Sequence, residues 1–115
     1  MKRIFVDAFL QALRETIATN GLSVIPRASN NQALIDLGLT PKLREEIICN
    51  LTGENYAQGP LADDQGLPGE VWIFGYEVDG REIYIKLKIA EMQGIKYAKC
   101  LSFHPSQHRL RYPLK

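Results

Sequence analysis

An Asp-Gly pair at positions 79 and 80 lies between two alternating apolar stretches, and it constrains the fold more than any other feature of the chain. Glu70–Val78 precedes the pair and Arg81–Ile89 follows it. Both central residues of a two-residue hairpin turn favour positive φ, which Asp and Gly tolerate. The sequence therefore predicts a tight antiparallel hairpin here.

The two faces of this hairpin differ in chemistry because side chains alternate along a strand. One face carries an apolar layer that we expect helices to cover, made of the cross-strand pairs Tyr76/Ile83, Phe74/Ile85 and Trp72/Leu87. The other face carries the pairs Glu77/Glu82, Gly75/Tyr84 and Ile73/Lys86, with Lys88 beyond them. Gly75 leaves space above the sheet, where another backbone or a ligand could approach.

Helical periodicity dominates the chain before the hairpin. Residues 3–19 carry apolar side chains at three- and four-residue steps, as in an amphipathic helix. A second short helix is expected with Asn30 or Asn31 as its cap, and Thr40-Pro41 opens a third. The inner stripe of the third helix is expected to consist of Leu43, Ile47 and Leu51, with Ile48 alongside.

The remaining segments complete a single domain over residues 1–115. Residues 52–69 are rich in Gly and Pro and are expected to be irregular. A third strand is expected at about 95–103, and residues 110–114 form a fourth strand or an extended tail. The predicted class is α+β, with amino-terminal helices packed on an antiparallel sheet of three or four strands.

Composition fits a globular domain, since 45% of the residues are hydrophobic and 23% are charged. The apolar stretches are too short for a membrane helix, and charged residues interrupt any signal-peptide core near the amino terminus, so we expect a cytoplasmic protein. Cys49 and Cys100 lack the spacing of metal ligands and are expected to be small buried residues. No metal or other cofactor is expected.

The net charge of +1 conceals an asymmetry along the chain. Residues 45–82 contain nine acidic side chains and one basic side chain, whereas residues 92–115 contain five basic side chains and no acidic one. Such a local concentration of positive charge can bind phosphate even when the whole chain is nearly neutral. A solvated basic tail without a ligand is the alternative.

The third strand adds polar groups to the hairpin. If Leu101 and Phe103 face the core, the face of Tyr84 and Lys86 also receives Cys100, Ser102 and His104. A phenol, one or two ammonium groups and an imidazole suit RNA, because lysines bind phosphate and an imidazole transfers protons near neutral pH. Solvent-facing lysines and a strand-end histidine without any catalytic role are the plainer interpretation.

Several strings of the chain, spread over residues 20–104, together resemble the MqsR family of toxins. They are Leu37-Gly38-Leu39-Thr40, Leu51-Thr52-Gly53-Glu54-Asn55-Tyr56, Val71-Trp72, Val78 to Lys88, and Leu101-Ser102-Phe103-His104. The resemblance implies a RelE-like fold and a metal-independent endoribonuclease, an mRNA interferase that cleaves single-stranded mRNA and inhibits translation and growth. It also implies a cognate antitoxin protein as partner, with no membrane association.

The resemblance also carries four active-site positions onto this chain. The tyrosine of the family falls on Tyr84 and is retained. A loop lysine falls on Gln58, a glutamine on Ile73 and a lysine of the last strand on His104. The catalytic set is therefore expected to be rearranged, with Tyr84 and His104 transferring protons and Lys86 supplying positive charge. The expected RNA contacts are Lys88, Gln58, Arg109, Arg111 and Tyr112.

Other functions compete with this one. A non-catalytic RNA- or protein-binding regulatory module on the same fold would accommodate the departures from the family positions. Direct DNA binding is not expected, because no recognition helix with a basic face is visible. The acidic loop 59–70 is interpreted first as a connection, and otherwise as an active-site lid or an antitoxin contact, in which Asp63 and Asp64 could repel RNA.

Overall fold

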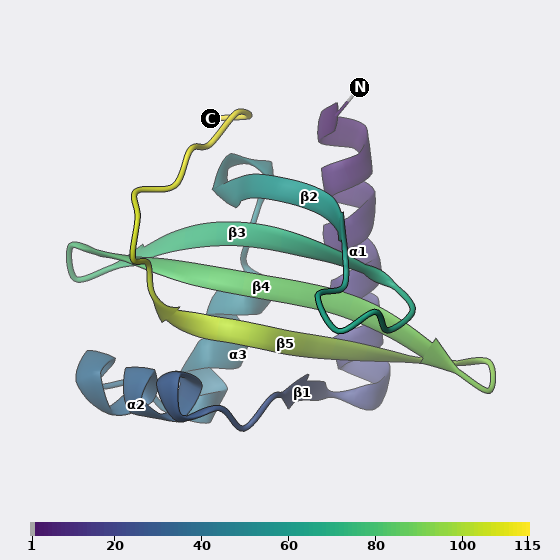
Figure 1. Cartoon of the computed structure of the whole chain (residues 1–115), viewed down its shortest axis with the longest axis horizontal. Helices are drawn as coiled ribbons and strands as arrows, with labels where there is room; N and C mark the ends of the chain where they lie inside the picture. Colours follow the sequence, from purple (N-terminus) through teal and green to yellow (C-terminus); the bar gives the residue numbers. More distant parts are fainter. Residues whose placement is uncertain (1) are drawn as a thin grey trace.

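The computed structural model describes residues 2–115 and consists of three helices, a short 3-10 turn and one mixed five-stranded sheet (Figure 1). The elements are α1 (Lys2–Asn20), β1 (Leu22–Val24), α2 (Ala28–Leu37), α3 (Pro41–Cys49), η1 (Gly53–Asn55), β2 (Tyr56–Ala62), β3 (Glu70–Val78), β4 (Arg81–Met92) and β5 (Ile95–Pro105). The strand order is β1-β5-β4-β3-β2. No helix within residues 2–115 is long and apolar enough to cross a membrane.

The α+β class is confirmed, but the predicted sheet of three or four antiparallel strands is wrong in number and direction. β1 adds a parallel edge strand beside β5, with Ser23 opposite Lys99. β2 adds a strand at the other edge, within the stretch that its Gly and Pro content predicts to be irregular. Residues 110–114 form no strand and instead belong to an extended tail.

The predicted hairpin is confirmed with its register. Asp79 and Gly80 have φ values of 50° and 78°, as the tight turn requires. Cross-strand pairing then places Tyr84 opposite Gly75 and Lys86 opposite Ile73. The faces of β3 and β4 are consequently those that the alternation predicts.

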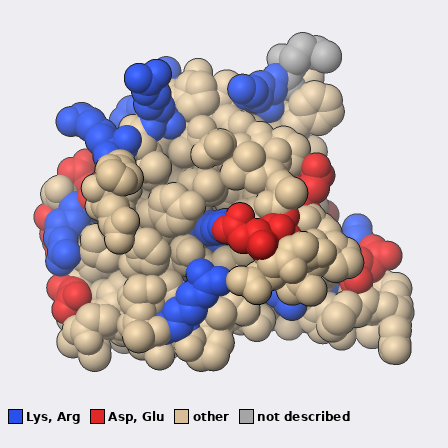
Figure 2. All heavy atoms as spheres, viewed as in Figure 1, with Lys and Arg blue, Asp and Glu red and all other residues tan. Residues whose placement is uncertain are grey.

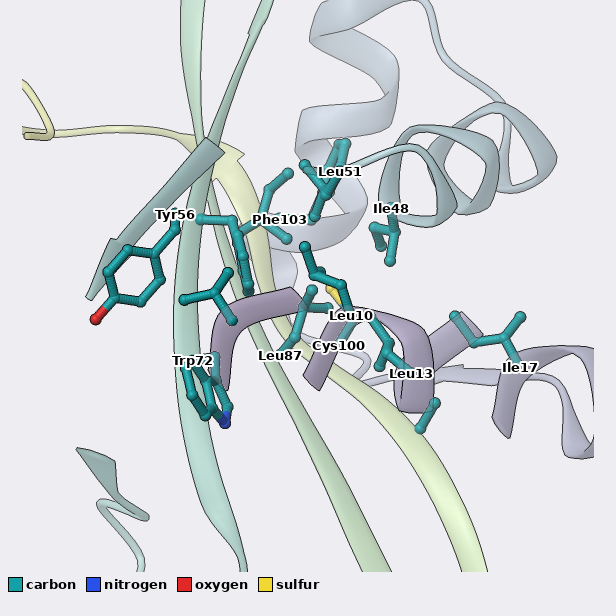
Figure 3. Packing of buried hydrophobic residues seen from close by; sticks show 14 of the residues in the cluster. Leu10, Leu13, Ile17, Ile48, Leu51, Tyr56, Trp72, Leu87, Cys100 and Phe103 are labelled. Atoms are coloured by element: carbon teal, nitrogen blue, oxygen red, sulfur yellow. The ribbon is translucent and has the colours of Figure 1, made fainter. Parts of the chain in front are cut away.

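The core lies between the sheet and the helices α1 and α3, which cover one face (Figure 1). Leu10 and Leu13 of α1 lie beside Leu87 and Cys100 of the sheet (Figure 3). Burial of each such leucine or phenylalanine contributes roughly 1.5–3 kcal/mol, so this layer provides the main drive for folding.

The helices differ from expectation at two places. Asn30 caps nothing; its side chain is fully buried inside α2, which begins at Ala28 after Arg27. In α3, the cap by Thr40 is confirmed, since its hydroxyl accepts a hydrogen bond from Leu43 N at 3.1 Å. Leu43 itself is exposed, however, and the buried residues of α3 are Arg44 and Ile48. As predicted, Ile47 packs against the core and Leu51, just after the helix, is buried in it.

A β-bulge in β5 changes which side chains face the core. Lys86 pairs with Ser102, but the next residue of β4, Leu87, pairs with Cys100, so Leu101 is the extra residue. The expectation that Leu101 faces the core and Cys100 faces away is therefore wrong. Cys100 is fully buried in the core, and its burial raises the pKa of the thiol to about 12.

Candidate functional site

The sheet face away from α1 and α3, called here the open face, is crossed by two irregular segments. Of the predicted acidic loop 59–70, residues 59–62 belong to β2 and residue 70 to β3. The remaining residues 63–69, called the acidic loop from here on, lie in front of the strands, and the tail 106–115 passes their opposite ends (Figure 1). Figure 2 shows this face with acidic atoms near its middle and basic atoms around them. The candidate site lies on the strands between these two segments.

Tyr84 and His104 form the centre of the open face. They are direct cross-strand partners on β4 and β5, and their rings stack with centroids 5.6 Å apart and planes 19° apart. His104 Nδ1 lies 3.0 Å from the carbonyl oxygen of Pro105. Because a carbonyl only accepts hydrogen bonds, this contact assigns the proton to Nδ1, and the neutral ring then offers Nε2 as a base.

Two lysines follow Tyr84 on the same face and both meet carboxylates of the acidic loop. Lys86 Nζ lies 2.8 Å from Asp64 Oδ2, with the Lys86 side chain 15% exposed and that of Asp64 77% exposed. Lys88 Nζ lies 2.7 Å from Asp63 Oδ2, with the two side chains only 3% and 5% exposed. The two pairs therefore differ in kind, since the first is open to solvent on the Asp64 side and the second is enclosed on both sides.

The enclosed pair also holds the acidic loop in place. Asp63 Oδ1 accepts a hydrogen bond from Gln65 N at 2.7 Å, so one carboxylate fixes both the loop turn and Lys88. The hydrogen bond from Lys88 holds the pKa of Asp63 below its ordinary value of 3.8. Gly69 approaches the Lys88 side chain so closely that a Cβ would lie 3.2 Å from Lys88 Cε.

The tail occupies the space that Gly75 leaves above the sheet. A Cβ at Gly75 would collide with the hydroxyl of Tyr112 and lie 2.8 Å from Leu110 Cδ1. Glu82 anchors both residues, because it accepts hydrogen bonds from Leu110 N at 2.9 Å and from Tyr112 Oη at 2.6 Å. Burial, and then the bond to Glu82, raise the pKa of the Tyr112 phenol above its ordinary value of 10.0.

Two concavities flank the Tyr84–His104 pair. A wide groove of about 1030 Å³ lies along the tail and includes Glu54, Tyr76, Glu77, Arg109 and Lys115 in its wall. A smaller hollow of about 230 Å³, called here the basic hollow, lies under the acidic loop and includes Arg27, Lys86, Lys88 and Lys99 together with Asp63 and Asp64.

The catalytic candidates are thus brought together and the RNA-contact candidates only in part. Tyr84, His104 and Lys86 lie in neighbouring cross-strand rows of the open face. Tyr112 and Arg109 border the groove beside them, and Arg111 is exposed on the tail. Gln58 is exposed on β2 directly opposite Ile73.

Lys88 does not fit the expected role in RNA binding. Its ammonium is enclosed with Asp63 and has no free access to a phosphate in this arrangement. Three contributors to the face do not follow from the sequence reasoning, namely Arg27, Lys99 and the anchoring role of Glu82. The position of Arg27 could have been found from the short apolar stretch Leu22–Val24, which indicates a strand. Pairing of this strand, β1, with β5 brings the residues that follow it to the open face.

Within residues 2–115, no group of three or more His, Cys, Asp or Glu side chains could hold a metal ion. Comparisons of the chain with family models, with curated protein sequences and with solved structures return no significant match.

Proposed function

We propose that this chain is an endoribonuclease that cleaves single-stranded mRNA without a metal ion, as the toxin of a toxin–antitoxin pair. The observation that carries the proposal is the stack of Tyr84 on His104 with Lys86 in the neighbouring row. These three side chains supply a phenol, an imidazole and an ammonium group on one open surface. RNA cleavage by an internal nucleophile uses these kinds of group.

The reaction proposed is attack of a ribose 2′-hydroxyl on the adjacent phosphorus. One group accepts the 2′-hydroxyl proton while the new P–O bond forms, and another donates a proton to the departing 5′ oxygen as the old P–O bond breaks. His104 Nε2 is suited to accept the first proton, because Nδ1 already bonds Pro105. Tyr84 donates the second, and Lys86 stabilises the charge on the phosphate oxygens.

The toxin assignment, the RelE-like fold and the cognate antitoxin belong to this proposal because they rest on the resemblance to the MqsR family. The structure supports it at the level of architecture, with amino-terminal helices on a sheet whose open face carries Tyr84. Of the four carried-over positions, Tyr84 and His104 are direct partners, and so are Gln58 and Ile73. The positions therefore form two pairs on the same sheet.

The test is cleavage of a single-stranded RNA in EDTA by the wild type, Tyr84→Phe and His104→Ala. We expect each variant to cleave about 10²–10⁴ times more slowly, which is the usual contribution of a proton-transferring side chain. Tyr97→Phe and His108→Ala are matched controls. Tyr97 pairs with Ala90, far along the hairpin from Tyr84, and His108 is exposed in the tail. Equal cleavage by all five proteins contradicts the assignment of the site.

A non-catalytic RNA- or protein-binding module is the second candidate, and the ion pairs of the acidic loop favour it. Lys86 and Lys88 both have carboxylate partners, so the open face carries less free positive charge than its lysines suggest. Growth arrest on expression that disappears with His104→Ala but persists with His108→Ala would support the nuclease over the binding module.

A further inference from the structure

The basic hollow contains more positive charge than its carboxylates neutralise. Four basic side chains and two acidic ones line it. Lys88 and Lys99 are direct cross-strand partners, and like charges in that position repel. Asp63 compensates Lys88, but the ion pairs of the described chain involve Arg3, Lys86 and Lys88, and neither Arg27 nor Lys99. An anion in the hollow would relieve this repulsion.

One of the two carboxylates is suited to be replaced by such an anion. Asp63 is fixed by its turn and its enclosed bond to Lys88. Asp64 is 77% exposed and meets Lys86 from the solvent side. Because the Asp64 carboxylate stays hydrated in this ion pair, the pair is weak, and a phosphate that also contacts Arg27 and Lys99 can exchange with Asp64.

The place of the hollow relative to Tyr84 suits a nucleic-acid strand. Lys86 lies two residues from Tyr84 on β4, about 7 Å along the strand. Lys99 lies opposite Lys88, a further two residues along. A single strand whose scissile phosphate lies at Tyr84 and His104 would therefore bring a neighbouring phosphate to the hollow.

We propose that the basic hollow is a phosphate-binding subsite for single-stranded RNA, in which Arg27 and Lys99 hold a backbone phosphate that displaces Asp64 from Lys86. The proposal rests on the proposed function for the identity of the strand, but its binding step requires no cleavage. Loop 63–69 then acts as an internal competitor of RNA.

The experiment measures binding of a 2′-O-methylated RNA oligonucleotide, which lacks the attacking hydroxyl, by fluorescence anisotropy over a range of salt concentrations. We expect the double variant Arg27→Gln/Lys99→Gln to bind more weakly. The logarithmic salt slope should fall by about 0.7, the value for one phosphate contact on a single strand. Asp64→Asn should bind more tightly than the wild type because Lys86 no longer has an internal partner. Circular dichroism checks that each variant is folded.

Lys96→Gln is the control for the Lys99→Gln half of the double variant, because it removes one positive charge from the same strand, β5. Lys96 lies two residues before Ala98, which faces the core, and thus on the face away from the hollow. If Arg27→Gln/Lys99→Gln shows the same salt slope of oligonucleotide binding as the wild type and Lys96→Gln, the subsite proposal is overturned. Stabilisation of the wild type, but not of the double variant, by inorganic phosphate, together with equal oligonucleotide binding by both proteins, would assign the hollow to free phosphate and also overturn it.

The outcomes also separate this proposal from the proposed function. If Tyr84→Phe and His104→Ala cleave normally while Arg27→Gln/Lys99→Gln loses binding, the assignment of the active site fails and the phosphate subsite stands. If cleavage depends on Tyr84 and His104 while oligonucleotide binding is unchanged in Arg27→Gln/Lys99→Gln, only the subsite proposal fails.

Discussion

Glu82 and Tyr112 fasten the carboxy-terminal tail to the open face, because the Tyr112 hydroxyl donates a 2.6 Å hydrogen bond to the Glu82 carboxylate, near the start of β4. The same carboxylate accepts a bond from Leu110 N. The carboxy-terminal tail is therefore attached beside Tyr84 by one acidic side chain. Its position decides how much of the sheet face is open to a ligand.

Glu82→Ala should release the tail. Hydrogen bonds to a charged group contribute about 1.5–3 kcal/mol each, so loss of both should raise the released fraction by about a hundredfold or more. Limited trypsin digestion measures this release, since Arg109 and Arg111 lie in the tail. Glu77→Ala is the control, because Glu77 is the exposed cross-strand partner of Glu82. Equal digestion of both variants would show that Glu82 does not hold the tail.

Gly75→Ala should release the tail by collision. The added methyl group would overlap the Tyr112 hydroxyl and crowd Leu110, and both lie on the tail rather than in the core. We expect the tail to move and the unfolding free energy to fall by about 1–3 kcal/mol, the usual cost of overpacking. Faster trypsin digestion with a lower urea midpoint would support this contact, whereas wild-type behaviour in both assays would argue against it.

The hairpin could be predicted from the sequence because its determinants are local. Asp79-Gly80 sets the turn, and alternation along Glu70–Val78 sets the faces. The extended conformation of residues 22–26 could be predicted as well, but the pairing of β1 and the existence of β2 could not. β1 has three residues and β2 contains Gly59 and Pro60, so both depend on pairing with strands distant in the sequence.

In the candidate site, too, the features set by local sequence could be predicted and those set by distant segments could not. Tyr84, Lys86 and His104 follow from strand alternation and lie where it places them. The bulge at Leu101 exchanges the faces of Leu101 and Cys100, because one extra residue reverses the side of those before it. The ion pairs of Lys86 and Lys88 with Asp64 and Asp63 depend on how loop 63–69 folds over the sheet. The Gly and Pro content of the loop does not specify that conformation.

Lys86 and Lys88 should differ in function although they are two residues apart. Lys86→Gln should reduce RNA cleavage by about 10²–10³, the usual effect of removing one group that stabilises transition-state charge. It should hardly change the urea midpoint, because the Asp64 carboxylate that loses its partner is exposed to water. Lys88→Gln should instead lower the urea midpoint, because Asp63 is left enclosed without its partner. Similar midpoints for the two variants would contradict this division.

Asp63 should make the stability of the protein depend on acidic pH. Its pKa is lowered in the folded state by Lys88, so its contribution is complete above the ordinary value of 3.8 and is lost as pH falls through the lowered pKa. The difference in urea midpoint between the wild type and Asp63→Asn should therefore be constant above that pH and shrink below it. Asp64→Asn should cost less stability near neutral pH, since its pair is exposed. If the difference in urea midpoint between the wild type and Asp63→Asn stays the same at acidic pH, the charge of Asp63 does not account for its contribution to stability.

Asn30 should be the most sensitive polar residue of the helical layer, because its buried side chain joins α2 to the bulged strand. Nδ2 donates to Ile25 O at 3.0 Å and to Leu101 O at 3.2 Å, and Oδ1 accepts from Phe103 N at 2.9 Å. Asn30→Ala leaves these three backbone groups without that partner. At about 1–3 kcal/mol for an unsatisfied buried group, we expect a loss of at least about 2 kcal/mol in unfolding free energy.

The neighbouring Asn31 provides the control for that change, since it has the same side chain but is exposed on α2. Asn31→Ala should alter the unfolding free energy by no more than about 0.5 kcal/mol. Asn30 holds the backbone of Phe103, the residue directly before His104. Asn30→Ala should therefore also displace His104 and slow RNA cleavage, at temperatures where the variant is still folded. Comparable unfolding free energies for the two variants would show that α2 does not fix the bulge, and the placement of His104 would then depend on β4 alone.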